Sequence, residues 1–199
     1  ADVEALQLLI AHGGDLEWSP SRVAEAGAAA NGNVGRAPLL AAMVGGKGVP
    51  ISAGPGYNRE GPPPFREPSN RNPVDAMRVL LEAGANPDVK TPQREKGALD
   101  GVDFVWGGET ALHDAARTRR IDVIRLLAEY GATLDMPDAN GMTPLAMAEN
   151  PLPDDPPNEF GPETGIYGEA TDAEVAAVLR ELLEQRDARV AAARPDAAQ

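Results

Sequence analysis

The stretch GETALHDAARTRRIDVIRLLAEYGATLD, residues 108–135, contains two short segments in which apolar residues recur at helical spacing. A basic Thr-Arg-Arg turn separates the two segments, and Gly131 follows the second one. Glycine is common where a helix ends, because the backbone there often adopts a left-handed conformation. The stretch therefore predicts a helix over 110–117, a second helix over 121–130 and a turn after them.

Parts of this stretch recur elsewhere in the chain. GMTPLAMAEN (141–150) repeats its beginning at a distance of 33 residues, and GRAPLLAAM (35–43) is a third copy. DAMRVLLEAGANPD (75–88) and EALQLLIAHGGDLE (4–17) repeat its second half. Such repetition indicates a solenoid of stacked helix pairs, since one pair cannot bury its apolar face alone.

The repeated motif resembles that of the ankyrin-repeat family, whose signature is Thr-Pro-Leu-His-x-Ala in a period of 33 residues. TALHDA (110–115) and TPLAMA (143–148) carry the resemblance, which is to bacterial-type members with long loop insertions. It implies an all-α solenoid of stacked helix-turn-helix pairs with extended irregular loops. The residues expected to form its structural motif are Thr110, Leu112, His113, Thr143, Pro144 and Leu145.

We expect one ankyrin-repeat domain over 1–186, followed by a polar tail over 187–199. The expected repeats are a partial one at 1–18, one at 35–88 with an insertion at 45–72, one at 108–138, and a C-terminal one at 139–186 with an insertion at 151–171. Further insertions are expected at 19–34 and 89–107. Loops of this length inside a compact domain are usually functional or disordered. The expected helices are 2–12, 37–44, 73–83, 110–117, 121–130, 143–149 and 172–186.

A hydroxyl, an imidazole and a carboxylate stand close together at Thr110, His113 and Asp114. A catalytic interpretation needs a nucleophile beside a base that is free to accept a proton. The family resemblance implies instead that the threonine caps a helix and that the histidine bonds the adjoining turn. Leu40 and Ala146 replace His113 in the sister repeats, which favours the structural role. We therefore predict no catalytic residue.

No cofactor or metal site is predicted. The chain has no cysteine, which excludes thiolate catalysis and cysteine metal ligands. DMPDANG (135–141) has oxygen-bearing residues at alternate positions, as calcium loops do, but the twelfth position holds Ala146 rather than a glutamate. A turn between repeats accounts for this segment better.

The net charge of −13 argues against nucleic acid as a partner and against an anionic membrane. No apolar run is long enough to span a bilayer, and no signal segment is visible; the compartment, cytoplasmic or exported, stays open.

No lysine or arginine lies between Arg125 and Arg180, whereas acids recur there. This acidic C-terminal end is either solvated surface or the side that meets a basic partner. Because residue 1 falls inside a helical pattern, we expect a longer parent chain.

We expect the function to be non-catalytic protein binding through the fingers, the loop insertions and the concave surface that the resemblance implies. Aromatic residues near arginine on loops are typical of interface anchors. The candidates are Tyr57, Arg59, Phe65, Arg66, Phe104 and Trp106. The alternative for each ring is that it holds its own loop against the domain. A second hypothesis is an accessory or docking domain of a larger polypeptide or assembly. An enzyme is the third, and no motif supports it.

Overall fold

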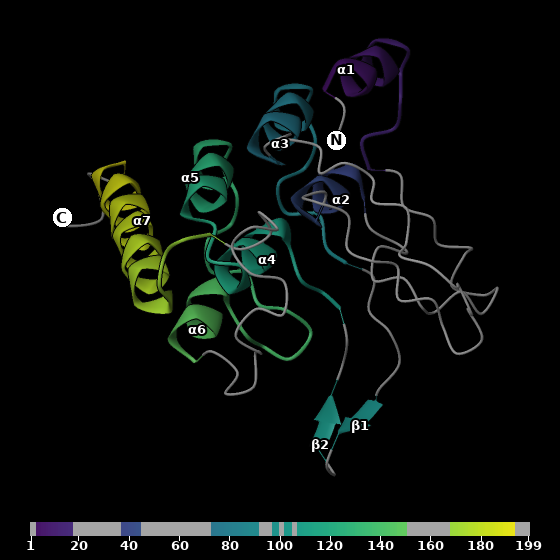
Figure 1. Ribbon diagram of the computed structural model, residues 1–199. Coiled ribbons are helices and arrows are strands. Elements are labelled where there is room, and N and C mark those ends of the chain that lie inside the picture. The colour runs from purple at the N-terminus through teal and green to yellow at the C-terminus, as the bar shows by residue number, and fades with distance from the viewer. Residues whose placement is uncertain are drawn as a thin grey trace.

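The computed structural model describes residues 3–17, 37–44, 73–91, 97–99, 102–104, 107–150 and 168–193. Its helices form two rows (Figure 1). The outer row consists of α1 (Val3–Ala11), α3 (Pro73–Glu82), α5 (Ile121–Glu129) and α7 (Asp172–Ala192). The inner row consists of α2 (Pro38–Val44), α4 (Ala111–Arg117) and α6 (Pro144–Glu149).

Each inner helix packs against the outer helix that follows it, so that α2–α3, α4–α5 and α6–α7 form three pairs. Neighbouring pairs contact one another along both rows, and α1 packs on α3. Alanines fill many inner-row positions, which lets the short helices approach closely. The core between the rows is built from apolar side chains with almost no exposed surface, among them Leu39, Leu40, Met77, Leu80, Leu112, Ile124, Leu127, Val175 and Leu179. This stack is the all-α solenoid that the sequence predicts.

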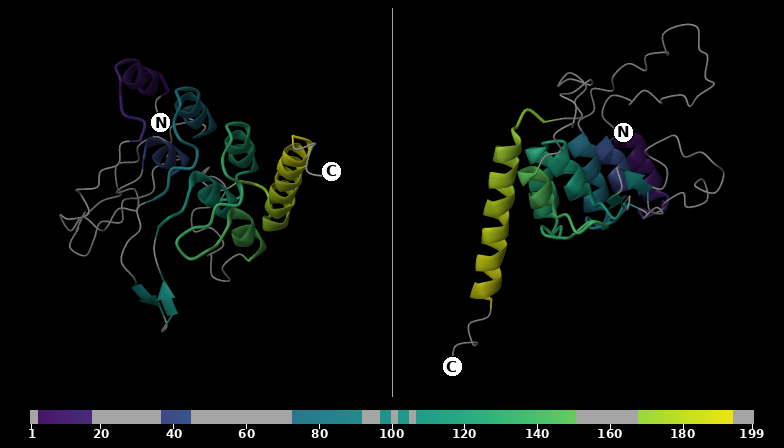
Figure 2. Two further views of the ribbon diagram at one scale, coloured as in Figure 1. Left: turned by 180° about the vertical axis from the view of Figure 1, so that it is seen from behind. Right: turned by 90° about the horizontal axis from the view of Figure 1, so that it is seen from below.

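The last helix is longer than the sequence analysis predicts. We expected it to end at 186 and a tail to begin at 187, but α7 continues to Ala192. The additional turns follow from the composition of 187–192, in which three of the six residues are alanine and none is Gly or Pro. Figure 2 shows that α7 extends well past the other helices.

Two short strands lie in the insertion that we expected to be irregular. β1 (Gly97–Leu99) and β2 (Val102–Phe104) pair antiparallel, with Gly97 opposite Phe104. In Figure 1 the hairpin stands apart from the helices, on the side of the inner row. It adds a β element to an otherwise helical stack.

The turn between α4 and α5 holds the start of α7 in place. Arg119 in this turn forms a bidentate pair with Asp172, at 2.7 Å from Nε to Oδ1 and 3.1 Å from Nη2 to Oδ2. The N–H of Gly168 donates to the Thr118 carbonyl at 2.7 Å. A Cβ at Gly168 would lie 1.9 Å from the Arg119 carbonyl oxygen, so only glycine fits there. The backbone entering α7 is thus held directly on the repeat before it.

Candidate interaction surface

His113 links two neighbouring repeats. Its Nδ1 accepts the backbone N–H of Thr110 at 3.1 Å and therefore carries no proton. The neutral ring then bears its proton on Nε2, which donates to the carbonyl oxygen of Met142 at 3.1 Å. Burial lowers the pKa of His113 below its ordinary value, which favours this neutral form. Both ring nitrogens are therefore committed to structural hydrogen bonds.

The two threonines of the motif begin their helices in different ways. Thr143 caps α6 as expected, because its hydroxyl oxygen accepts the N–H of Ala146 at 3.2 Å. At α4 Thr110 is also the N-cap, but in a capping box: its side chain faces the backbone N–H of His113, the His113 side chain accepts the N–H of Thr110, and the Thr110 hydroxyl lies 2.9 Å from His113 Nδ1. The reason is the third helical residue. An imidazole there offers an acceptor, whereas the methyl group of Ala146 offers none.

Asp114 does not complete a catalytic arrangement. Its carboxylate is almost fully buried and pairs with Arg117 one turn later. The three residues therefore contain no free base and no carboxylate that orients the imidazole. Their geometry supports a helix start and a tie between repeats.

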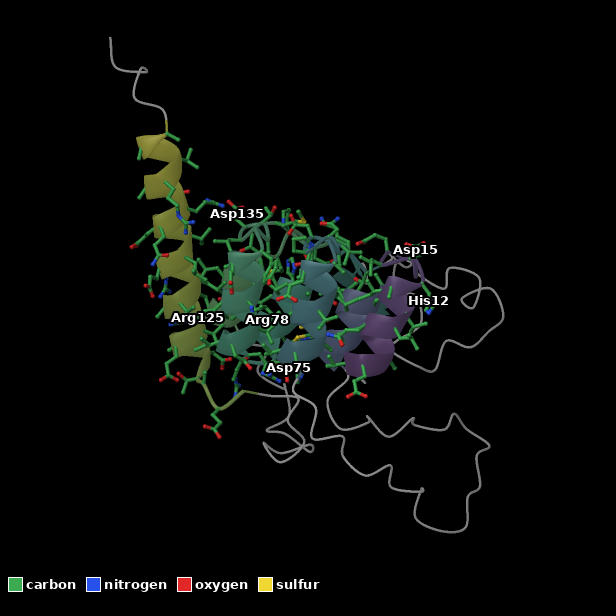
Figure 3. All side chains as sticks on the ribbon, turned by 90° about the horizontal axis from the view of Figure 1, so that it is seen from above. His12, Asp15, Asp75, Arg78, Arg125 and Asp135 are labelled. Atoms are coloured by element: carbon green, nitrogen blue, oxygen red, sulfur yellow. The ribbon has the colours of Figure 1, made fainter. Side chains whose placement is uncertain are left out.

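The acid that follows each glycine turn connects successive repeats. Glu17 accepts the N–H of Asn86 at 2.8 Å, and Asp88 accepts the N–H of Thr133 at 2.8 Å. Asp88 also accepts the Thr133 hydroxyl at 2.6 Å. We call Glu17, Asp88 and Asp135, each four residues after its glycine, the turn acids. Asp15 and Asp135 lie along the same edge of the stack, opposite the edge that holds Asp75 (Figure 3).

A second row of hydrogen bonds supports the segment between α3 and α4. Thr91 and the residues before α4 pair reciprocally: the Thr91 N–H donates to the Glu109 carbonyl at 2.8 Å, and the Gly108 N–H donates to the Thr91 carbonyl at 2.9 Å. Thr91 therefore lies beside Gly108 and Glu109, which brings together the residues on either side of the segment 92–107. We call this segment, with its β1–β2 hairpin, the β-finger. Its base is held further by the Ala139 N–H, which donates to the Gly107 carbonyl at 3.3 Å.

Of the six predicted partner-binding residues, Phe104 falls on the β-finger, as the last residue of β2. Tyr57, Arg59, Phe65, Arg66 and Trp106 lie outside the described residues. The sequence does contain a signal for the hairpin. Asp100-Gly101 separates the two strands, and Asp-Gly between apolar residues is a strong indicator of a two-residue hairpin connection.

Many acids of the C-terminal end have partners inside the molecule. Glu149 pairs with Arg180 at 2.6 Å and Asp172 pairs with Arg119. Asp138 accepts the backbone N–H groups of Asn140 and Met142 at 2.8 Å each, so the loop once compared with a calcium site is a hydrogen-bonded turn. Within the described residues no cluster of three or more metal-ligand side chains occurs. The helices described here include none that is long and apolar enough to cross a membrane.

Taken together, the fold and these contacts define a solenoid of short helix pairs joined through their turns. The family model for ankyrin repeats, in three copies, matches residues 69–150. This region of the chain therefore consists of ankyrin repeats, and α1, α2 and α7 extend the same stack beyond it. Solenoids of stacked repeats form extended concave surfaces of the kind that proteins use for binding.

Two relatives share parts of the sequence. The 2-5A-dependent ribonuclease of Homo sapiens is 33% identical over 87 residues, which covers 43% of this chain and 12% of that protein. The potassium channel AKT3 of Oryza sativa subsp. japonica is 50% identical over 42 residues, which covers 21% of this chain and 5% of that protein. The chain thus spans only a small part of either relative.

Proposed function

We propose that this chain is a non-catalytic binding module that holds a protein partner between its β-finger and the neighbouring insertions. The observation that carries the proposal is the paired base of the β-finger. A loop of this length would ordinarily be costly to order, but hydrogen bonds at both ends fix its exit and entry. Pre-organisation of this kind lowers the entropy lost when a partner binds.

The anchors that we propose are Phe104 and Trp106 on the β-finger and the aromatic–arginine pairs of the 45–72 insertion. Aromatic and arginine side chains supply most of the energy in protein interfaces when they are buried at the centre. A partner with a basic surface fits the net charge of −13, which would accelerate its approach at low ionic strength.

Docking within a larger polypeptide or assembly is the second candidate. The exposed Leu8 and Leu9 of α1 favour this second candidate, because the end of a solenoid that faces water is normally polar. An enzyme is not supported by His113, whose two nitrogens are both engaged.

The test is capture of partners from the source cells by the immobilised chain, followed by measurement of Kd for the partner identified. Phe104→Ala and Trp106→Ala should each weaken binding about tenfold or more while circular dichroism stays unchanged. Tyr130→Ala is the matched control, an aromatic residue at the end of α5 and outside the β-finger. Equal affinity of the wild type and both finger variants would refute the proposed anchors.

A further inference from the structure

The turn that precedes α6 is closed by one carboxylate. Asp138 Oδ1 accepts the backbone N–H groups of Asn140 and Met142 at 2.8 Å each. The Asp138 N–H in turn donates to the Met142 carbonyl at 2.8 Å. We call residues 137–142 the linking turn. Because the next residue, Thr143, is the cap of α6, the linking turn and the start of that helix form one unit.

The linking turn lies against the base of the β-finger. The Lys90 ammonium donates to the Pro137 carbonyl at 3.0 Å, and the Ala139 N–H donates to the Gly107 carbonyl at 3.3 Å. The two backbones are also closely packed, since a Cβ at Gly108 would lie 2.8 Å from the Ala139 nitrogen. The base of the finger therefore cannot move toward the last repeat without displacing the turn.

Helix α4 holds the linking turn from a third side. The Met142 carbonyl oxygen accepts Nε2–H of His113 at 3.1 Å in addition to the Asp138 N–H. Both acceptor positions of this oxygen are thus used, one from within the turn and one from the preceding repeat. The finger base, α4 and α6 together fix the position of the turn.

We propose that the linking turn couples the base of the β-finger to the last repeat, so that α6 and α7 control how firmly the finger is held. Local opening of the last repeat would release the turn and its hydrogen bonds to the finger base. Displacement of the finger base would weaken α6 by the same free energy, because such coupling is reciprocal.

The consequence for binding rests on the proposed function, since a partner must be held by the finger to sense the last repeat. A molecule that stabilises the C-terminal helices would then raise the fraction of chains with an ordered finger base, and with it the affinity at the finger. The coupling itself does not depend on a partner and can be measured in the free chain.

The experiment follows amide hydrogen exchange of the full chain, residue by residue, by NMR. Asp138→Ala removes the carboxylate that closes the linking turn. The amides of Thr91 and Gly108, which bond the finger base, should then exchange at least about fivefold faster. Thr171→Ala is the matched control, because it removes the cap of α7 in the same repeat and leaves the turn intact. In this control the two amides should keep their wild-type rates.

The reverse direction is read from the Met147 amide of α6, which donates to the Thr143 carbonyl at 3.0 Å. Gly108→Ala should accelerate exchange of this amide, because the added methyl group meets the backbone of Ala139. Gly131→Ala is the control. Its φ of 83° is similar to the 74° of Gly108, but nothing lies within 4 Å of its Cβ position.

Lys90→Met is a second variant on the finger side, and it leaves the backbone unchanged. It removes the donor to the Pro137 carbonyl and should also accelerate exchange of the Met147 amide, by less than Gly108→Ala does. The Ala83 amide, which donates to the Val79 carbonyl in α3, should keep its wild-type rate and so shows that the variant is folded.

Equal exchange of the finger-base amides in Asp138→Ala and Thr171→Ala would overturn the proposal. So would a Met147 amide that exchanges at the wild-type rate in both Gly108→Ala and Lys90→Met. Coupling in a chain that captures no partner would support this proposal and refute the proposed function alone.

Discussion

Arg186 of α7 donates to Asp135, with 2.9 Å between Nη1 and Oδ2, and so completes the row of turn acids. At the two preceding repeats the turn acid accepts a backbone N–H from the next turn. The last repeat has no such turn, because its second helix lacks the closing glycine and continues to Ala192. A side chain from that longer helix takes the place of the backbone donor, and the hydrogen bond with Asp135 raises the pKa of Arg186.

The turn acids should differ in their contribution to stability. Asp88→Ala removes two acceptor contacts to Thr133 and should lower the free energy of unfolding by about 0.5–1.5 kcal/mol. Arg186→Gln should have a smaller effect, because its pair with Asp135 is open to solvent and screened by salt. Urea unfolding at low and high salt measures both. A larger loss for Arg186→Gln would contradict this order.

Leu127→Ala should lower the free energy of unfolding by about 2–5 kcal/mol, because the side chain is fully buried and its removal leaves a cavity. Leu126→Ala should behave similarly. The internal control is Leu9→Ala, the same substitution at the same repeat position on an exposed residue. Its effect should stay within about 0.5 kcal/mol. Similar losses for Leu9→Ala and Leu127→Ala, measured by urea unfolding, would show that the exposure of α1 is not as described.

His113→Ala should cost about 1–3 kcal/mol, because the buried N–H of Thr110 loses its acceptor and the Met142 carbonyl loses its donor. Thermal unfolding measures the loss. Any activity that disappears in this variant while Tm stays unchanged would argue for a chemical role instead.

The stability contributed by His113 should depend on pH. Because burial lowers its pKa below 6.5, the unfolded chain binds a proton more readily than the folded one. The contribution should be complete above pH 6.5 and should decline as the pH falls from 6.5 to the folded-state pKa. Unfolding curves of the wild type and His113→Ala should therefore converge over this range. A difference in the free energy of unfolding between the wild type and His113→Ala that grows as the pH falls would contradict this prediction.

Arg119 is the one non-glycine residue with positive φ, 58°, among those described. Arg119→Ala loses the pair with Asp172 and keeps the backbone strain. Arg119→Gly loses the same pair but relieves roughly 1 kcal/mol of strain. The glycine variant should therefore have the higher Tm of the two in a thermal melt. The reverse order would mean that the left-handed turn is not retained in the variants.

The helices of the stack could be predicted from the sequence because each repeat contains residues that typically begin and end a helix. Thr143 and Gly131 mark a helix start and a helix end through local backbone chemistry. The pairing partners could not be predicted in the same way. His113 and Met142 are 29 residues apart, and the sequence around either residue does not predict that the two are in contact.

The sequence by itself thus determined the repeat unit and its helical class, since these depend on spacing and local propensity. Only the tertiary structure decided which side chains join the repeats, as with the turn acids and Arg186. It also decided that Leu9 faces solvent while Leu80 and Leu127 are buried. Those outcomes depend on which helix lies beside each residue, and similar local sequences acquire different environments at the middle and at the end of a stack.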